Sequence, residues 1–182
     1  MKISEIKWTS LMKKLNQNLF EYLVFFFLFL SSPANSEEKF INGYQVRVID
    51  GDSVEIMKEK IRLFGIDAPE INQMCYKENN IHYACGHVSK LALERYIKKF
   101  SDYKIYCYYS ERDKYNRILG DCYIGPNSLL NINRYMVFEG YAVAYLRYSE
   151  KYLDAQNQAK KDKVGIWAGT FDLPEEWRKK NK

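Results

Sequence analysis

Alternating apolar and polar positions in the middle of the chain predict a small β-sheet. Short runs rich in β-branched residues have a period of two, and turn residues such as those at Asp50–Asp52 and Lys58–Glu59 separate them. The five predicted strands are Gln45–Ile49, Ser53–Met57, Lys60–Phe64, Lys104–Tyr109 and Ile118–Ile124. Because only short turns join the first three strands, we expect them to form a meander.

Apolar residues three and four positions apart predict helices between and after these strands. The first helix follows a polar loop, spans about fifteen residues, and places these side chains on one face: Val88, Ala92, Leu93, Tyr96, Ile97 and Phe100. The second is expected over Leu129–Glu139, before Gly140 as a left-handed terminating residue. The third is expected over Glu150–Lys163, with Ser149 as its cap and Gly165 as its stop.

Short strands with interspersed helices are typical of a small barrel. The sequence therefore predicts an α+β fold, a five-stranded OB-type β-barrel with about three packed helices. The residues at 175–182 are polar and are interpreted as a tail beyond the last element.

The N-terminal segment has the order of a secretory signal peptide. Lys13 and Lys14 precede the apolar run Tyr22–Leu30, and small residues follow it up to Ser36, after which we expect cleavage. An uncleaved membrane anchor is the alternative, but the nine residues of the run are far fewer than the roughly 20 that a bilayer requires. The prediction is a signal peptide at 1–36, one domain at 37–182, and a periplasmic or secreted protein.

All four cysteines lie in the part that would be exported, where an oxidising compartment allows them to pair. Three connectivities are possible. We favour Cys75 with Cys85, which closes a polar loop, and Cys107 with Cys122, which joins two neighbouring predicted strands. The alternative for the loop is a zinc site with the ligands Cys75, His82, Cys85 and His87. Its cysteines are farther apart than the usual spacing of about two to four residues.

The formal net charge of +5 is compatible with a polyanionic partner, but the placement of the charges says more. Carboxylates occur in Asp50–Asp52 and in Asp67–Glu70, and Arg62 and Arg117 accompany them. Carboxylate oxygens suit a hard cation such as Ca²⁺, and guanidinium groups match phosphate oxygens in a planar, bidentate way. Each piece alone fits an ordinary turn or strand face. Their co-occurrence favours a metal-assisted phosphodiesterase.

The chain resembles the thermonuclease, or staphylococcal nuclease-like, family from about Tyr44 to Trp167. The matching pieces, in the order of the family, are Ile49–Val54, Arg62–Glu70, Asp113–Arg117, Phe138–Ala142 and Gln158–Trp167. Five pieces in the right order are more specific than any one of them. The paired cysteines and the closing Trp177-Arg178 are similar to an exported bacterial branch of that family.

The resemblance implies a site for one Ca²⁺ ion. Its ligands would be the carboxylates of Asp52 and Asp67 and the backbone carbonyl of Ala68, and water would complete the flexible oxygen shell that Ca²⁺ accepts. The family often has threonine at the positions of Ser53 and Ala68. The alanine keeps the carbonyl and lacks the hydroxyl.

The resemblance also implies roles for the catalytic residues. Glu70 would orient and deprotonate a metal-polarised water, and Arg62 and Arg117 would grip the scissile phosphate as charge builds on it. Tyr115 and Tyr148 would line the nucleotide pocket. A one-residue shift decides whether the further tyrosine position falls on Tyr145 or on Leu146.

These implications describe a Ca²⁺-dependent endonuclease that hydrolyses DNA, RNA or both by in-line attack and breaks the bond to the 5′ oxygen. We expect it to be a monomer, with nucleic acid as its substrate and without a stable protein partner. Stacking on tyrosine rings tolerates any base, which suits loose sequence preference. The alternative is a non-catalytic OB-type module that binds single strands or a protein, but such a module has no need of Glu70, Arg62 and Arg117 together.

Overall fold

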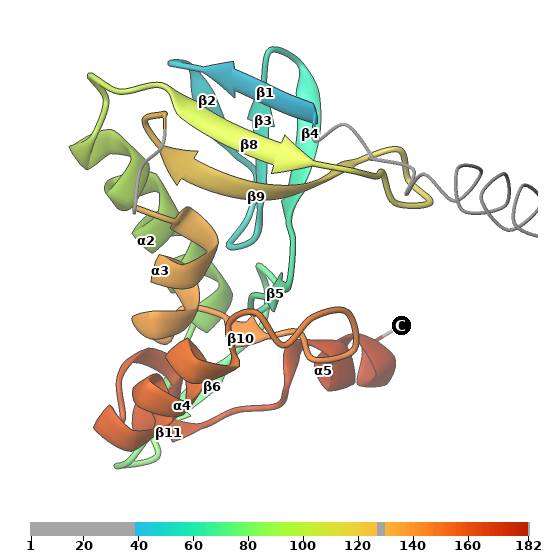
Figure 1. Cartoon of the computed structure of the whole chain (residues 1–182). Helices are drawn as coiled ribbons and strands as arrows, with labels where there is room; N and C mark the ends of the chain where they lie inside the picture. The colour runs from blue at the N-terminus through green and yellow to red at the C-terminus, as the bar shows by residue number, and fades with distance from the viewer. Residues whose placement is uncertain (1–38, 127–129, 182) are drawn as a thin grey trace, which may run out of the picture. The chain divides into compact units, whose positions relative to one another are not determined.

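The protein was analysed as a computed structural model, which describes residues 39–126 and 130–181. Its central strands are β1 (Lys39–Gly43), β2 (Val46–Val48), β3 (Ser53–Ile56), β4 (Glu59–Leu63), β8 (Ile105–Tyr109) and β9 (Ile118–Ile124). They form one six-stranded sheet in the order β1-β8-β9-β4-β3-β2 (Figure 1). The five predicted strands are present and the α+β, OB-type class is confirmed. The edge strand β1 is an addition that the sequence did not indicate.

The sheet joins two antiparallel units through one parallel contact. β2, β3 and β4 form the predicted meander, and β8 and β9 form a hairpin. β4 then pairs with β9 in parallel, with Ile61 opposite Ile118. Both cysteines of the hairpin are buried and lie directly opposite each other, and they form the disulfide Cys107–Cys122 with a Cα–Cα distance of 4.0 Å.

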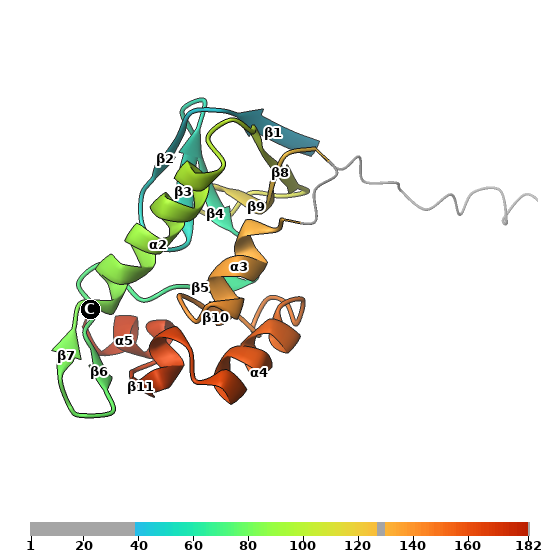
Figure 2. The same cartoon turned by 90° about the vertical axis from the view of Figure 1, so that its left-hand side faces the viewer.

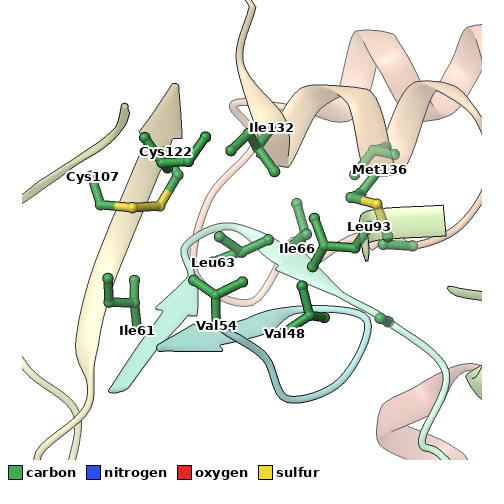
Figure 3. Packing of buried hydrophobic residues seen from close by; sticks show 14 of the residues in the cluster. Val48, Val54, Ile61, Leu63, Ile66, Leu93, Cys107, Cys122, Ile132 and Met136 are labelled. Carbon is green, nitrogen blue, oxygen red and sulfur yellow. A yellow bond between two sulfur atoms is a disulfide. The ribbon is translucent and has the colours of Figure 1, made fainter. Parts of the chain in front are cut away.

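The core lies between the sheet and the helices. The strands contribute Val54, Ile61 and Leu63, and the helices contribute Leu93 and Met136, all almost fully buried (Figure 3). The alternation along β9 explains this placement, because every second residue from Ile118 to Ile124 is buried. The predicted period of two therefore identified the inward face of the sheet.

The described residues include four α-helices beside the sheet: α2 (Cys85–Lys99), α3 (Ile132–Phe138), α4 (Leu153–Asp162) and α5 (Pro174–Lys180). Helix α2 contacts β2 and α3 (Figure 2). Its fifteen residues match the predicted length, but Val88, which we placed on the buried face, is 41% exposed. The predicted polar tail is wrong in its greater part, because those residues belong to α5.

The predicted ends of α3 and α4 need correction. Helix α3 begins after Asn131, whose side chain accepts a hydrogen bond from the backbone N–H of Arg134, and residues 127–129 lie outside the described part. Gly140 has φ of +68°, the left-handed conformation predicted for it. Helix α4 starts later than Glu150 and ends at Asp162. The next residue, Lys163, adopts φ of +50°, so the helix has stopped before Gly165.

The polar loop before α2 has structure of its own. It contains β6 (Cys75–Lys77) and β7 (His82–Tyr83), and β6 also pairs with β11 (Gly169–Thr170), which follows the 3-10 helix η1 (Gly165–Ala168). The disulfide Cys75–Cys85 joins this hairpin to the start of α2. The structure thus forms both predicted cysteine pairs, and the zinc alternative loses the thiolates that it requires.

A last strand pairing connects the segment that follows β4 to the C-terminal part of the chain. The short strand β5 (Ile66–Asp67) pairs with β10 (Val143–Ala144), which places Asp67 opposite Val143. In the described parts of the chain, none of the helices combines the length and the apolarity needed to span a bilayer. The predicted signal peptide, residues 1–36, lies outside the described residues.

Candidate active site

Strand pairing places the first acidic and basic side chains of the site together. The register of β3 with β4 sets Ser53 opposite Arg62, so Asp52, at the turn before β3, lies beside Arg62. The chain then turns through Gly65, whose φ of +75° favours glycine, and enters β5 with Asp67. Residues that are up to fifteen positions apart in sequence thus meet at one end of the sheet.

Arg62 connects the two carboxylates that we predicted as metal ligands. Its Nη1 donates to Asp52 Oδ1, and its Nη2 donates to Asp67 Oδ1 at 2.8 Å. Asp52 Oδ2 accepts a hydrogen bond of 2.9 Å from the backbone N–H of Ala68. Asp52 is 4% exposed and Asp67 is 1% exposed. The two carboxylates are therefore buried, and both accept hydrogen bonds from a single guanidinium group.

Burial shapes the ionisation of this cluster. Burial, followed by the negative charge of Asp52, raises the pKa of Asp50 to about 6. Burial also raises the pKa of Asp67, against the hydrogen bonds from an arginine of helix α5. For Arg62, burial would lower the pKa, but the charges of Asp52 and Asp67 outweigh it, so the pKa is raised and the guanidinium stays ionised.

Glu70 is held through its backbone by a buried glutamine that the sequence analysis missed. Gln73 is fully buried; its Oε1 accepts from the backbone N–H of Glu70 at 3.2 Å, and its Nε2 donates to the carbonyl of Asp172 at 2.7 Å. The start of α2 presses on the same loop, because a Cβ on Gly86 would lie 1.8 Å from the carbonyl oxygen of Glu70. The loop that carries Glu70 is therefore fixed from two sides.

Arg178 is the second functional residue that sequence reasoning missed. From helix α5, its two Nη atoms donate to both carboxylate oxygens of Asp67 at 2.9 Å each, and Nη1 also donates to Glu70 Oε1 at 2.8 Å. Burial would lower the pKa of Arg178, but these hydrogen bonds outweigh it and raise it. A signal was present in the sequence, since Pro174 is typical of the first helical turn and the residues after it include Arg178.

Arg117 reaches the site from the loop between β8 and β9. Asp113 accepts hydrogen bonds from the backbone N–H groups of Tyr115 and Arg117, and its Oδ2 lies 2.8 Å and 2.7 Å from Nε and Nη2 of Arg117. Burial would raise the pKa of Asp113, but the hydrogen bonds from Arg117 and Tyr115 outweigh it and lower it. Asp113 thus fixes the loop and the direction of the guanidinium.

These groups line one cleft of about 640 Å³. Acidic and basic side chains line it, and so do three tyrosines of the predicted nucleotide pocket, Tyr115, Tyr145 and Tyr148. Of the two residues considered for the further tyrosine position, Tyr145 lines the cleft and Leu146 does not. Asp67 is buried and is not part of the lining, but it accepts hydrogen bonds from Arg62 and Arg178, which are. The structure therefore brings all the predicted site residues together.

The donor set fits a hard divalent cation that keeps part of its water. The carboxylates of the cluster outnumber its arginines: Asp50, Asp52, Asp67 and Glu70 face Arg62 and Arg178. Within residues 39–126 and 130–181, no group of three or more histidine, cysteine, aspartate or glutamate side chains could hold a metal. The expected ligands are only two carboxylates and a carbonyl, so water and phosphate oxygens would complete the shell.

Comparisons with known proteins agree with this geometry. Residues 60–169 match the family model described as staphylococcal nuclease homologue. An uncharacterized endonuclease of Escherichia coli is 33% identical over 140 residues, which cover 74% of this chain and 82% of the relative. A micrococcal nuclease of Shigella flexneri is 30% identical over 171 residues, 85% of this chain and 88% of the relative. A succinoglycan biosynthesis protein of Rhizobium meliloti is 33% identical over 141 residues, 77% and 71% of the two chains.

Proposed function

The chain belongs to the staphylococcal nuclease family, and on this premise we propose that it is an exported, calcium-dependent endonuclease that hydrolyses phosphodiester bonds of DNA, RNA or both. Membership of the family supports a metal-dependent nuclease with nucleic acid as its substrate. The observation that carries the proposal is the convergence of buried carboxylates, Glu70 and two anchored arginines on one cleft.

Both predicted phosphate-binding arginines are anchored and still have donors to spare. A guanidinium group has five N–H donors. Arg62 uses its two Nη atoms on Asp52 and Asp67, and Arg117 uses Nε and Nη2 on Asp113, so each retains N–H groups for the oxygens of a phosphate. Because the aspartates fix the directions of these donors beforehand, the arginines can stabilise the charge that develops on phosphorus without rearranging.

Glu70 is placed to accept a proton from the attacking water. Its backbone is held by Gln73 and its carboxylate by Arg178, so the oxygen that takes the proton has a defined position at the cleft. Bound Ca²⁺, held by Asp52, Asp67 and the carbonyl of Ala68, would supply positive charge that acidifies water and neutralises phosphate. The deprotonated water would then attack phosphorus in line, opposite the 5′ oxygen, and the bond between phosphorus and the 5′ oxygen would break.

Loose sequence preference follows from the aromatic wall of the cleft. Tyr115 is 68% exposed and Tyr148 is 61% exposed, and Tyr145 packs edge-on against Tyr148 with ring centroids 4.9 Å apart. An exposed ring offers a stacking surface that every base can use. The substrate is therefore bound by its phosphates and by the faces of its bases.

Export is supported by the cysteines and the N-terminal sequence together. The four cysteines are all paired in the structure, and disulfides of this kind persist in oxidising compartments outside the cytosol. The run of apolar residues before Ser36 is typical of a signal peptide, which would direct the chain to export. The proposed location is the periplasm or the exterior of the cell.

Digestion of heat-denatured DNA by the purified protein tests the proposal. We expect digestion with Ca²⁺ and none with excess chelator, and we expect Glu70→Gln to lower kcat by about 10³-fold, because it removes the general base. Glu94→Gln is the matched control: this residue lies on α2, pairs with Lys90 at 3.9 Å, and is expected to leave kcat unchanged. Full activity of Glu70→Gln would contradict the role of Glu70. Undiminished digestion in chelator would contradict calcium dependence, and binding of DNA without cleavage would favour the non-catalytic module.

A further inference from the structure

The residue with the most contacts to the catalytic carboxylates lies outside the region that matches the family model. That region ends at residue 169, whereas Arg178 lies on helix α5, and its guanidinium holds Asp67 and Glu70 together. Resting on the function proposed above, we propose that Arg178 is a positioning residue of the active site, which shares Asp67 with the metal ion and aims the Glu70 carboxylate.

The hydrogen bonds of Asp67 show why the arginine and the ion must share it. Asp67 Oδ1 accepts from Arg62 and from Arg178, and Oδ2 accepts from Arg178. Arg178 therefore covers both oxygens of a predicted metal ligand in a bidentate contact. A cation that binds Asp67 has to displace part of this contact. The positive charges of the cation and of the Arg178 guanidinium, both beside the same carboxylate, also repel each other. Arg178 consequently weakens the affinity of the site for the ion.

Of the two arginines that contact Asp67, Arg178 is the one expected to release it when a cation binds. Arg62 sits on the central strand β4, its side chain is 18% exposed, and it also holds Asp52. Arg178 lies on a helix of seven residues, and its side chain is 32% exposed. When the ion takes Asp67, Arg178 keeps its contact with Glu70, because the same Nη1 reaches both carboxylates.

The contact with Glu70 gives Arg178 its second effect. The Glu70 side chain is 37% exposed, and within the described residues Arg178 is its single hydrogen-bonding partner. Without it the carboxylate turns freely about its side-chain torsions while the backbone remains fixed by Gln73. Misplacement of a catalytic group by about 1 Å can cost about 10²-fold in rate, so kcat depends on this arginine through the position of Glu70.

The docking of α5 supports a functional position for Arg178. The segment before the helix is tied to the Glu70 loop by the hydrogen bond from Gln73 to the carbonyl of Asp172. The first turn of the helix is tied to the segment after β10 by the ion pair of Arg147 with Glu175 at 3.3 Å. These contacts bring α5 to the site independently of Arg178, so the arginine can be replaced without releasing the helix.

Calcium titration by isothermal calorimetry, without nucleic acid, tests the shared use of Asp67. We expect Arg178→Ala and Arg178→Gln to bind Ca²⁺ about ten-fold more tightly than the parent, which corresponds to one charge-assisted hydrogen bond that no longer competes. Lys179→Ala is the matched control, because it removes one positive charge from the same helix, where Lys179 pairs with Glu175 at 3.1 Å in a solvent-exposed contact. Its affinity should equal that of the parent.

Kinetics at saturating Ca²⁺ test the second effect. We expect kcat on denatured DNA to fall by about 10- to 100-fold in Arg178→Ala with KM unchanged, and Arg178→Lys to recover part of the loss because it restores one donor to Glu70. If the alanine variant fails to fold by circular dichroism, Arg178→Gln carries the same comparison. Equal calcium affinity and equal kcat in the parent, Arg178→Gln and Lys179→Ala would overturn the inference while the nuclease stands. A parent that neither binds Ca²⁺ nor cleaves DNA would instead contradict the proposed function.

Discussion

At the scale of single residues, replacing either predicted phosphate-binding arginine leaves carboxylates without a counter-charge, and the burial of these carboxylates differs between the two arginines. Arg62 neutralises two buried carboxylates, whereas Arg117 neutralises Asp113 in a loop near the surface. A buried charge that loses its partner is costly, and a partly solvated one is not. Similar chemical roles therefore carry different consequences for stability.

This difference gives a prediction for Arg62→Ala and Arg117→Ala. We expect Arg62→Ala to lower the free energy of unfolding by about 3 kcal/mol in the absence of metal, and Arg117→Ala to lower it by less than about 1 kcal/mol. Both should lose activity by several orders of magnitude, since each loses a donor to the transition state. Urea unfolding in chelator, beside a digestion assay, separates the two effects. Equal stability of the two variants would show that the Asp52–Asp67 cluster does not depend on Arg62.

The residues of the site were predictable to the extent that they belong to local motifs. Asp52, Asp67 and Glu70 stand in short segments whose residue types indicate their chemistry. Gln73 does not, because a buried glutamine is an ordinary residue until its partners are known. Arg178 stands in the closing Trp177-Arg178, but that pair of residues indicates no role until the partners of the arginine are known. Their roles depend on contacts with residues 99 and 111 positions away in the chain.

At the scale of elements, one carboxylate joins the last strand of the sheet to two helices. Asp121 on β9 accepts hydrogen bonds from Asn131, the cap of α3, at 2.6 Å, and from Tyr123 at 2.8 Å. It also accepts from the Lys151 ammonium and the Tyr152 hydroxyl, directly before α4. Burial would raise the pKa of Asp121, but these bonds outweigh it and hold the pKa below its ordinary value.

We therefore expect Asp121→Asn to lower the free energy of unfolding by about 2 kcal/mol at pH 7, because it removes charge-assisted hydrogen bonds from a part-buried network. The folded-state pKa lies below the ordinary value of 3.8, so the stabilisation is complete above that pH and is lost as the pH falls through the folded-state pKa. Unfolding curves at pH 7 and near pH 3 should show a smaller difference at the lower pH.

Asp162→Asn serves as the control for this prediction. Asp162 ends α4 and accepts one exposed hydrogen bond from Gln158, so its replacement should change stability by less than about 0.5 kcal/mol. A loss at pH 7 that is no larger for Asp121→Asn than for Asp162→Asn would contradict the network's contribution.

The elements were predicted well where periodicity is strong and poorly at their ends. The strands β3, β4 and β9 follow directly from alternation. Helix ends depend on which capping contacts the folded chain allows: Asn131 caps α3, and α4 ends one turn of chain before Gly165, which we predicted as its stop, because Lys163 already adopts the left-handed conformation. Strand β1 has no local signal of its own, because its place is set by pairing with β8.

At the scale of the whole molecule, the proposed export predicts a definite covalent state. We expect the protein recovered from the periplasm or medium of an expressing cell to lack residues 1–36 and to contain the two disulfides, as measured by intact mass before and after reduction. The cysteines fall within the retained part, so the mass change on reduction is an internal control. An uncleaved chain in the membrane fraction would support the anchor instead.

The sequence by itself determined five strands of the sheet and the acidic and arginine motifs, because periodicity and short spacings are local properties. It favoured the two cysteine pairs but left three connectivities open. Only the tertiary structure decided that Arg178 covers Asp67 and Glu70, and that Gln73 ties the Glu70 loop to Asp172. The physical reason is that these contacts arise when separately folded segments pack. Packing depends on the whole set of buried side chains, and no short segment of the sequence contains that information.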